Sequence, residues 1–307
     1  MFGYIVKRLL GAIPTMLLIM IAVFALIHIA PGGPFDNKRP MPAEVRANLN
    51  ATYHLDEPLL VQFGYYLSGV VQGDFGPSYK FKEFTVTELI GQAFPVSLKL
   101  GISALIIALL VGVPAGMVAA LKRDSLLDLV VMSTSMTGMV IPTFVLAPIM
   151  VMVFGVHLKW LPVAGWNHGA LPNMVMPVIA LSLPYVAYVA RMTRGSTLEV
   201  LRSNYIRTAQ AKGLPMRLVL FRHALKPALL PVVSFLGPAI AGIVVGSVVI
   251  ERIFGLPGLG RYFVDGAINR DYTLVMGVSI FYAALLLLMN IVVDVAYTFL
   301  DPRVKLK

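Results

Sequence analysis

Residues 207–231 read RTAQAKGLPMRLVLFRHALKPALLP, a basic, alanine-rich stretch between two long uncharged runs. Ser203 or Asn204 can cap a helix before it, and Gly213 followed by Pro215 ends that helix. The roughly nine residues between these signals predict a helix of about 14 Å. Because so short a helix is marginal alone in water, the rest of the protein or a docked partner has to hold it.

The chain is strongly apolar. Of its 307 residues, 58% are hydrophobic and only 13% are charged, with a mean hydropathy of +0.82. A soluble domain carries about 25% charged residues, so this composition indicates an integral membrane protein. The sequence contains no cysteine, which excludes disulfides, thiolate metal sites and cysteine nucleophiles.

Uncharged stretches of about 20 residues are candidate membrane spans. The six candidates are Leu9–Ile29, Leu100–Leu121, a run within Leu129–Val156, Leu171–Ala190, Ala228–Ile250 and Thr273–Leu300. The first is longer than the core of a signal peptide, which has about 7–15 apolar residues, so we expect a retained helix. The sequence therefore predicts an all-α membrane protein with six transmembrane helices.

The basic residues predict the orientation in the membrane. The predicted inner segments are 1–8, 122–128, 191–227 and 301–307. They carry 15 basic and 4 acidic residues. The predicted outer segments are 31–99, 157–170 and 251–272. These carry 10 of each. The positive-inside rule then places both termini in the cytoplasm. Topology also accounts for the net charge of +10, so no nucleic-acid partner is expected.

Two outer segments are more than connectors. Residues 31–95 mix apolar and charged side chains in a way unlike disordered sequence. They predict a folded cap with about two short helices and a GDFGPS turn, the alternative being a solvated linker. Residues 251–272 are rich in glycine but lack the Gly-Lys-Ser/Thr ending of a phosphate-binding loop. We expect a re-entrant turn there, packed against other helices.

Two groups of side chains within the spans are candidates for a functional role. Met132, Met136 and Met139 share one helical face and are candidate path-lining residues, although ordinary helix packing is favoured. Asn290 and Asp294 lie one turn apart in the sixth span. An acidic residue inside a membrane is a functional candidate, and a structural ion pair near the inner interface is favoured. The histidine spacing predicts no metal site.

The stretch RTAQAKG, with HALKPALLP downstream, resembles the cytoplasmic coupling loop of type I ABC-importer membrane subunits. The family's Glu-Ala-Ala falls on Arg207, Thr208 and Ala209, and its glycine on Gly213. The Arg-Thr-Ala variant is typical of the peptide/nickel permease branch. Resemblance to the oligopeptide permease B subunits of that branch runs nearly end to end, through VKRLLGAIPTMLLIM, APGGPFD, YHLDEPLLVQFGYYL, GDFGPSYK, ERIFGLPGLG and NRDYTLV.

The resemblance implies a type I ABC-importer transmembrane domain. Its implied parts are an amino-terminal helix at 1–30, a periplasmic cap at 31–95, a five-helix core at 96–300 that includes a coupling loop at 191–227, and a cytoplasmic tail at 301–307. It also implies that an ATPase subunit contacts Arg207, Thr208, Ala209, Lys212, Gly213, Leu214 and Pro215.

The implied function is ATP-driven import of oligopeptides across the bacterial inner membrane. The implied partners are a homologous second permease, one or two cytoplasmic ATP-binding subunits, a periplasmic peptide-binding protein and membrane lipid. ATP and Mg would bind in the partners, because this chain has no Walker A motif and no catalytic constellation. Dipeptide, glutathione and nickel permeases remain alternatives within the family. An ion-coupled secondary transporter is a further alternative, and an intramembrane enzyme is disfavoured.

Overall fold

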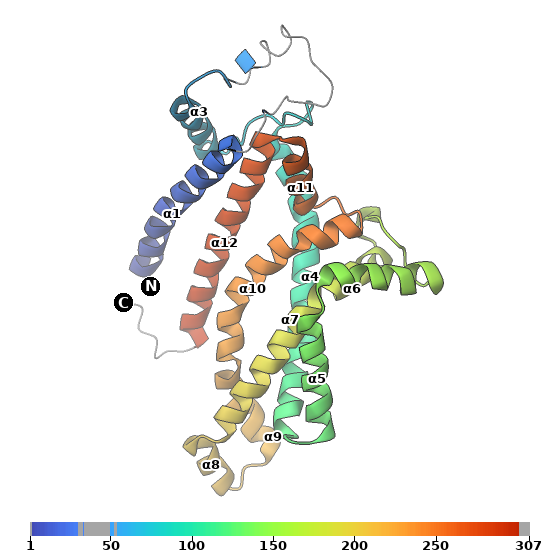
Figure 1. The fold of residues 1–307 in the computed structure, drawn as a ribbon. Helices are drawn as coiled ribbons and strands as arrows, with labels where there is room; N and C mark the ends of the chain where they lie inside the picture. The colour runs from blue at the N-terminus through green and yellow to red at the C-terminus, as the bar shows by residue number, and fades with distance from the viewer. Residues whose placement is uncertain (1, 30–32, 34–49, 52–53, 301–307) are drawn as a thin grey trace.

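The structure, a computed structural model, describes residues 2–29, 33, 50–51 and 54–300 (Figure 1). Every named element in these ranges is a helix. The long helices are α1 (Phe2–Ile29), α4 (Val86–Leu121), α7 (Leu171–Leu201), α10 (Leu225–Ile253) and α12 (Tyr272–Leu300). The predicted tail, 301–307, and the part of the predicted cap at 34–49 lie outside the described residues.

Shorter helices connect and cover the long ones. They are α3 (Leu59–Val71), α5 (Leu126–Val140), α6 (Thr143–Met150), the π-helix η1 (Val151–His157), the 3₁₀ turn η2 (Asn167–Gly169), α8 (Asn204–Ala211), α9 (Met216–Leu218), the π-helix η3 (Val219–Ala224) and α11 (Leu259–Asn269). In the described chain, five helices are long and apolar enough to cross a membrane, and a bent pair makes up a sixth span if it counts as one.

That bent pair corrects the predicted third span, Leu129–Val156. Helix α5 ends at Val140, and the chain turns by 101° before continuing as α6 and η1. Ile141 has ψ near 115°, which is extended rather than helical. A proline disfavours the helical conformation of the residue before it, so Pro142 explains the break.

The other spans are confirmed, and their helices all extend beyond the predicted runs, α4 and α7 by the most. Helix α4 begins at Val86, within the predicted cap, because Thr85 and Glu88 form a capping box. The Thr85 hydroxyl accepts from the Glu88 amide at 3.2 Å, and the Glu88 carboxylate accepts from the Thr85 amide at 2.8 Å. Helix α7 continues to Leu201, beyond the predicted end at Ala190.

Small residues line the contact between α4 and α7. Ala104, Ala108, Gly112, Gly116 and Ala120 recur every four residues and are all buried. A Cβ on Gly112 would lie 2.8 Å from the carbonyl oxygen of α7 at position 186, and one on Gly116 would overlap the carbonyl oxygen at position 190. Without side chains at these positions, the two backbones approach closely, which is a usual basis of helix association in membranes.

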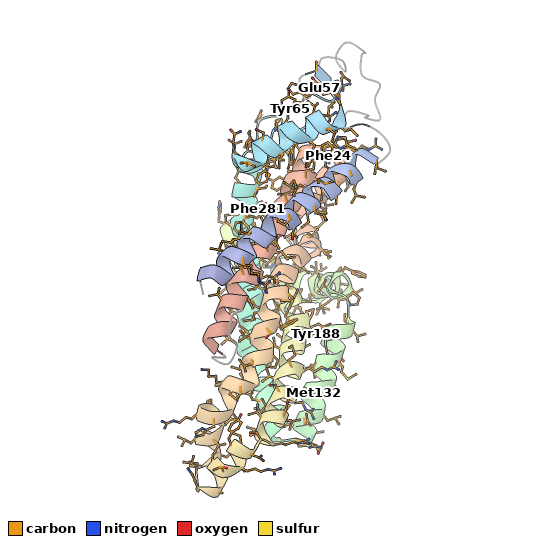
Figure 2. The ribbon with its side chains drawn as sticks, turned by 90° about the vertical axis from the view of Figure 1, so that its left-hand side faces the viewer. Phe24, Glu57, Tyr65, Met132, Tyr188 and Phe281 are labelled. Atoms are coloured by element: carbon orange, nitrogen blue, oxygen red, sulfur yellow. The ribbon has the colours of Figure 1, made fainter. Side chains whose placement is uncertain are left out.

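The remaining helices pack around this contact. Helix α5 lies against α7 and α4, while α10 contacts α7, α12 and α4. Helices α1 and α12 run side by side at one edge, and α3 crosses the end of this pair where α1 ends and α12 begins (Figure 1). Glu57 and Tyr65 of the cap lie at one end of the elongated molecule, and Met132 lies towards the other (Figure 2).

The glycine-rich turn after α10 encloses a carboxylate of the protein itself. Glu251 is fully buried. Its oxygens accept from the Ser97 hydroxyl at 2.5 Å and from the Gly260 amide at 2.8 Å. A Cβ on Gly258 would overlap the carboxyl carbon of Glu251. The turn is therefore packed against α4, as predicted, but α11 follows it as a helix that the sequence analysis did not anticipate.

A second buried carboxylate joins the cap to α12. Asp271 precedes the first residue of α12 and accepts from the Leu274 amide at 3.1 Å, as an N-cap residue does. Its other oxygen accepts from the Ser78 hydroxyl at 2.5 Å and from the Lys80 amide at 3.1 Å. The predicted GDFGPS turn, in which Gly73 and Gly76 have positive φ, is thereby fixed to the start of α12.

The α4–α7 contact yields a prediction about stability. We expect Gly116→Ala to lower the free energy of unfolding by about 1–3 kcal/mol, because the added methyl overpacks the contact. Gly91→Ala is the matched control in the same helix, since it meets open space and should raise that free energy by up to about 1 kcal/mol. Thermal unfolding of both purified variants in one detergent measures the difference. Equal stability of the two variants would contradict this account of the packing.

Candidate functional site

Helix α8 forms the tip of one end of the molecule (Figure 1). Its carboxyl end is a Schellman motif: the Gly213 amide donates to the Gln210 carbonyl at 2.9 Å, and the Leu214 amide donates to the Ala209 carbonyl at 3.3 Å. Gly213 has φ near +77°, in the left-handed region that glycine adopts without strain. The predicted end of the helix is confirmed to the residue.

The predicted start is right in position but wrong in mechanism. Ser203 is the N-cap residue of α8, yet its side chain makes no capping hydrogen bond. The Ser203 hydroxyl instead donates to the Val200 carbonyl at 2.6 Å, in the last turn of α7. Ser203 therefore fastens the corner between the two helices.

One face of α8 is buried against the end of the helix bundle. Ile206 is fully buried and Ala209 nearly so. They belong to a cluster with Met117 of α4, Val219 and Leu220 of η3, and Ala224. We call this group the anchor cluster. Because α8 has only eight residues, these contacts supply the support that so short a helix lacks by itself.

The opposite face of α8 is exposed. That face and the turn after α8 carry the remaining residues predicted for the ATPase interface, and all but Leu214 are exposed: Arg207 and Thr208 on the helix, and Lys212, Gly213 and Pro215 after it. Phe221 of η3 adds a large apolar side chain, 66% exposed, close by in the chain. The arrangement presents basic, small and aromatic groups together, which suits a protein partner.

A π-helix separates α8 from the long helix α10. Pro215 is the N-cap residue of the short helix α9. The chain then widens into η3 over Val219–Ala224 before α10 begins at Leu225. Short π-helical segments occur frequently at functional sites, and three residues of η3 belong to the anchor cluster.

A buried ion pair braces α7 just before α8. Asp128 of α5 receives two hydrogen bonds from Arg194 of α7, from Nε and from one terminal nitrogen, both at 2.6 Å. The Asp128 carboxylate also accepts from the Asp124 amide at 3.0 Å. The residue is only 4% exposed. Sequence reasoning missed this pair because its members are 66 residues apart.

The three predicted methionines lie on α5, whose packed side faces α7 and α4. Only Asp128 and Ser135 of α5 are buried, and Met136 is 60% exposed. Met132 and Met139 are partly buried. Met132 also lines a cavity of about 560 Å³ that includes Asp128 and Arg194. Whether the methionines line a path stays a prediction.

The two polar residues predicted in the sixth span both belong to α12. Asn290 lines a cavity between α12 and α1, together with Lys7 and Arg8. Asp294 lies in the same helix, but its side chain is outside the part of the chain that the structure describes, so its ion pairing remains a prediction. The cations beside Asn290 come from α1.

At the end of the molecule where α3 lies, a cavity of about 210 Å³ lies under that helix. Tyr66 lines it, and burial raises the pKa of its phenol. The Tyr66 hydroxyl has no hydrogen-bond partner among the described residues. In the same ranges, no three His, Asp or Glu side chains converge as they would around a metal ion.

Two family descriptions match the chain. "Binding-protein-dependent transport system inner membrane component" matches residues 112–306, and the corresponding amino-terminal family matches residues 1–101. The boundary between the two matches falls inside α4. Residues 102–111 of α4 lie between the two matches, and every other helix described above lies within one of them.

Curated relatives are similar over the full length. The "Oligopeptide transport system permease protein OppB" of Salmonella typhimurium is 53% identical over 99% of this chain and 100% of its own length. Its Escherichia coli K12 counterpart is 52% identical over the same shares. The "Dipeptide transport system permease protein DppB" of Bacillus subtilis is 43% identical over 100% of this chain and 99% of its own.

A solved structure shares the fold. It shows an inward-facing conformation of the MetNI methionine ABC transporter, with a TM-score of 0.56 and 17% sequence identity. The match covers 69% of this chain and 96% of the other. The predicted fold class, an ABC-importer transmembrane domain, is therefore confirmed.

The buried ion pair generates a prediction. Asp128→Asn leaves the Arg194 guanidinium partly buried without its anionic partner, and we expect a loss of about 2–5 kcal/mol of unfolding free energy. Asp124→Asn is the matched control, because Asp124 is 76% exposed in its surface pair with Arg123 and should lose less than about 1 kcal/mol. Chemical denaturation in one detergent compares them. A loss at Asp128 no larger than at Asp124 would show that the pair does not brace α5 and α7.

Proposed function

The chain belongs to the family of inner membrane components of binding-protein-dependent transport systems, and on that premise we propose that it is the permease subunit of an ATP-driven importer of oligopeptides. As an integral inner-membrane protein, it would form half of the path by which peptides cross the membrane. The observation that carries the proposal is identity of 53% to an oligopeptide permease over essentially the full length of both chains. The dipeptide permease relative is less similar, at 43%.

Coupling to the ATPase would pass through α8. Its exposed face, with Arg207, Lys212 and Gly213, would sit against an ATP-binding subunit that holds ATP and Mg. Its buried face, with Ile206 and Ala209, contacts α4 and η3 in the anchor cluster. A displacement of α8 by the partner would therefore move the ends of α4 and α10 together, as in transitions between two packed arrangements.

The second permease would cover the free side of α5. That side carries exposed Leu129, Val130 and Met136, which α7 and α4 leave uncovered. Two such subunits would enclose a path between them, with Met132, Met136 and Met139 as candidate lining residues. Methionine side chains adapt to varied partners, which suits a peptide whose side chains vary.

The outer cap would receive a periplasmic peptide-binding protein. We propose the same division of the chain, into an amino-terminal helix at 1–30, a cap at 31–95, a five-helix core at 96–300 and a tail at 301–307. The first core helix, α4, begins at Val86, inside the cap segment. The Asp271 network holds the cap loop to α12, so a protein docked on the cap would be in mechanical contact with a span.

The coupling proposal is tested by reconstituting the chain with its co-purifying subunits in liposomes. We expect ATP-dependent uptake of oligopeptides. In Gly213→Val, a β-branched residue in the left-handed region raises the free energy of the native end of α8 by at least about 1–2 kcal/mol. That penalty should reduce uptake about 5- to 30-fold while ATP hydrolysis persists.

Two variants control for the substitution itself. Gly213→Asn should largely retain uptake, because asparagine tolerates the left-handed conformation. Gly195→Val lies on an exposed part of α7 where a Cβ meets open space, and it should also retain uptake. Full uptake by Gly213→Val would contradict the coupling role of α8. ATP hydrolysis by the wild-type complex without uptake of any oligopeptide would contradict the proposed substrate.

The proposed orientation, with both termini in the cytoplasm, has its own test. The chain has no cysteine, so Lys82→Cys in the cap loop and Lys212→Cys after α8 each provide a single thiol. Both lysines are exposed. An impermeant maleimide added to intact cells stripped of the outer membrane should label position 82 and leave position 212 unlabelled until the membrane is opened. Labelling of both positions from outside would refute this topology.

A further inference from the structure

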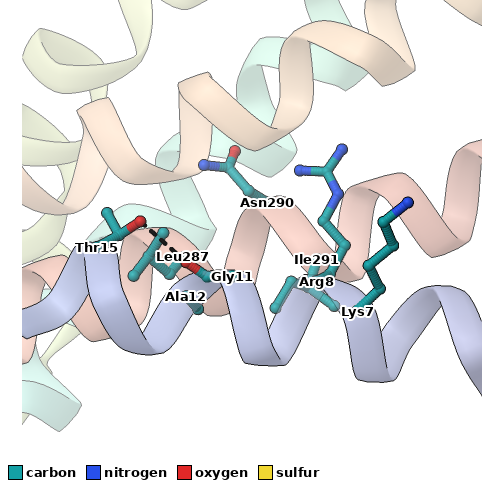
Figure 3. A pocket seen from close by; sticks show the side chains of 8 residues that line it. All are labelled: Lys7, Arg8, Gly11, Ala12, Thr15, Leu287, Asn290 and Ile291. Atoms are coloured by element: carbon teal, nitrogen blue, oxygen red, sulfur yellow. Dashed lines mark hydrogen bonds between the residues drawn. The ribbon is translucent and has the colours of Figure 1, made fainter.

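A cavity lies between α1 and α12, away from α8 and from the exposed face of α5. Its volume is about 450 Å³. Lys7, Arg8, Gly11 and Thr15 line it from α1, and Asn290 lines it from α12 (Figure 3). None of the functions proposed above uses this cavity.

The polar groups of the cavity are arranged for an anion. Lys7 and Arg8 are adjacent, exposed and cationic. In Figure 3, the Arg8 guanidinium and the Asn290 amide extend to the same side of the cavity, with the Lys7 side chain beside them. The Thr15 hydroxyl donates to the Gly11 carbonyl at 3.1 Å, which leaves its oxygen to accept. Cationic and amide donors together suit a phosphate oxygen.

The rest of the cavity is apolar. Ala12, Leu287 and Ile291 form its walls. The outward surface of α1 continues the apolar character, with exposed Leu9, Leu10, Ile13, Leu17 and Leu18. A phosphate held by Lys7 and Arg8 would therefore have hydrocarbon surface directly beside it. A free phosphate ion would gain no binding free energy from contact with these apolar walls, whereas the acyl chains of a lipid would.

The location fits the headgroup layer of a bilayer. Lys7 and Arg8 lie in the first two turns of α1, which begins at Phe2, and so near the end of a candidate span, where long basic side chains reach the interface. Basic pockets between membrane helices bind anionic lipid headgroups. From these residues we propose that the α1–α12 cavity is a binding site for one anionic phospholipid, with the phosphate on Lys7, Arg8 and Asn290 and an acyl chain along Leu287 and Ile291.

Photocrosslinking tests the proposal on the full complex in nanodiscs. The probe is phosphatidylglycerol with a diazirine in its acyl chain, diluted in phosphatidylcholine, and adducts are mapped by peptide mass spectrometry. We expect adducts within residues 7–15 and 287–291. A basic side chain near an anionic surface contributes about fivefold to binding, so Lys7→Gln with Arg8→Gln should reduce the adducts roughly 25-fold.

Matched variants separate charge from shape. Lys122→Gln with Arg123→Gln removes an identical Lys-Arg pair that lies in the turn between α4 and α5, and should leave the adducts at α1 unchanged. Gly11→Leu keeps both cations but fills the cavity, since a Cβ there meets open space. It should abolish the adducts, while Gly64→Leu in α3, also in open space, should not affect them.

Two further results would overturn the proposal. Equal labelling by a zwitterionic phosphatidylcholine probe would show that the cavity does not select an anionic headgroup. Displacement of the probe by millimolar inorganic phosphate or glycerol phosphate would identify a site for a free anion instead of a lipid. Neither result would bear on peptide import, which the uptake assay measures separately.

Discussion

The close approach of α4 and α7 is the constraint on which the other helices depend. In a membrane, helices gain little from burying apolar surface against one another, so contact distance and shape decide association. The small residues at 108, 112 and 116 let the α7 backbone lie against α4. At the end of this contact, Arg194 reaches Asp128 and so places α5. Met117, one residue beyond Gly116, belongs to the anchor cluster that holds α8.

The same constraint explains how a helix of eight residues is held in place. Helix α8 is fixed at its start by the corner at Ser203, at its end by the Schellman motif at Gly213, and along one face by Ile206 and Ala209. Each of these contacts leads back to α7, α4 or η3. The exposed face is thus rigidly connected to the long helices, although it has few contacts of its own.

Sequence reasoning succeeded where the signal is local. Long apolar runs located the spans, and the Gly213–Leu214–Pro215 ending located the end of α8, because both depend on neighbouring residues. Pro142 was also a local signal for a break, but the long apolar run around it led to the prediction of one continuous span. The Asp128–Arg194 pair and the partners of Glu251 and Asp271 were inaccessible, since they join residues that only the tertiary fold brings together.

The buried Glu251 has a consequence for how this protein can change over evolutionary time. Its carboxylate occupies the space that a side chain at position 258 would fill, and it accepts a hydrogen bond from the amide at position 260. A larger residue at position 258 is acceptable only if position 251 shrinks, and a shorter residue at 251 leaves the Ser97 hydroxyl and the amide at 260 without their acceptor. Effects at contacting positions are not additive, so positions 251 and 258 should be inherited together and vary together among related permeases.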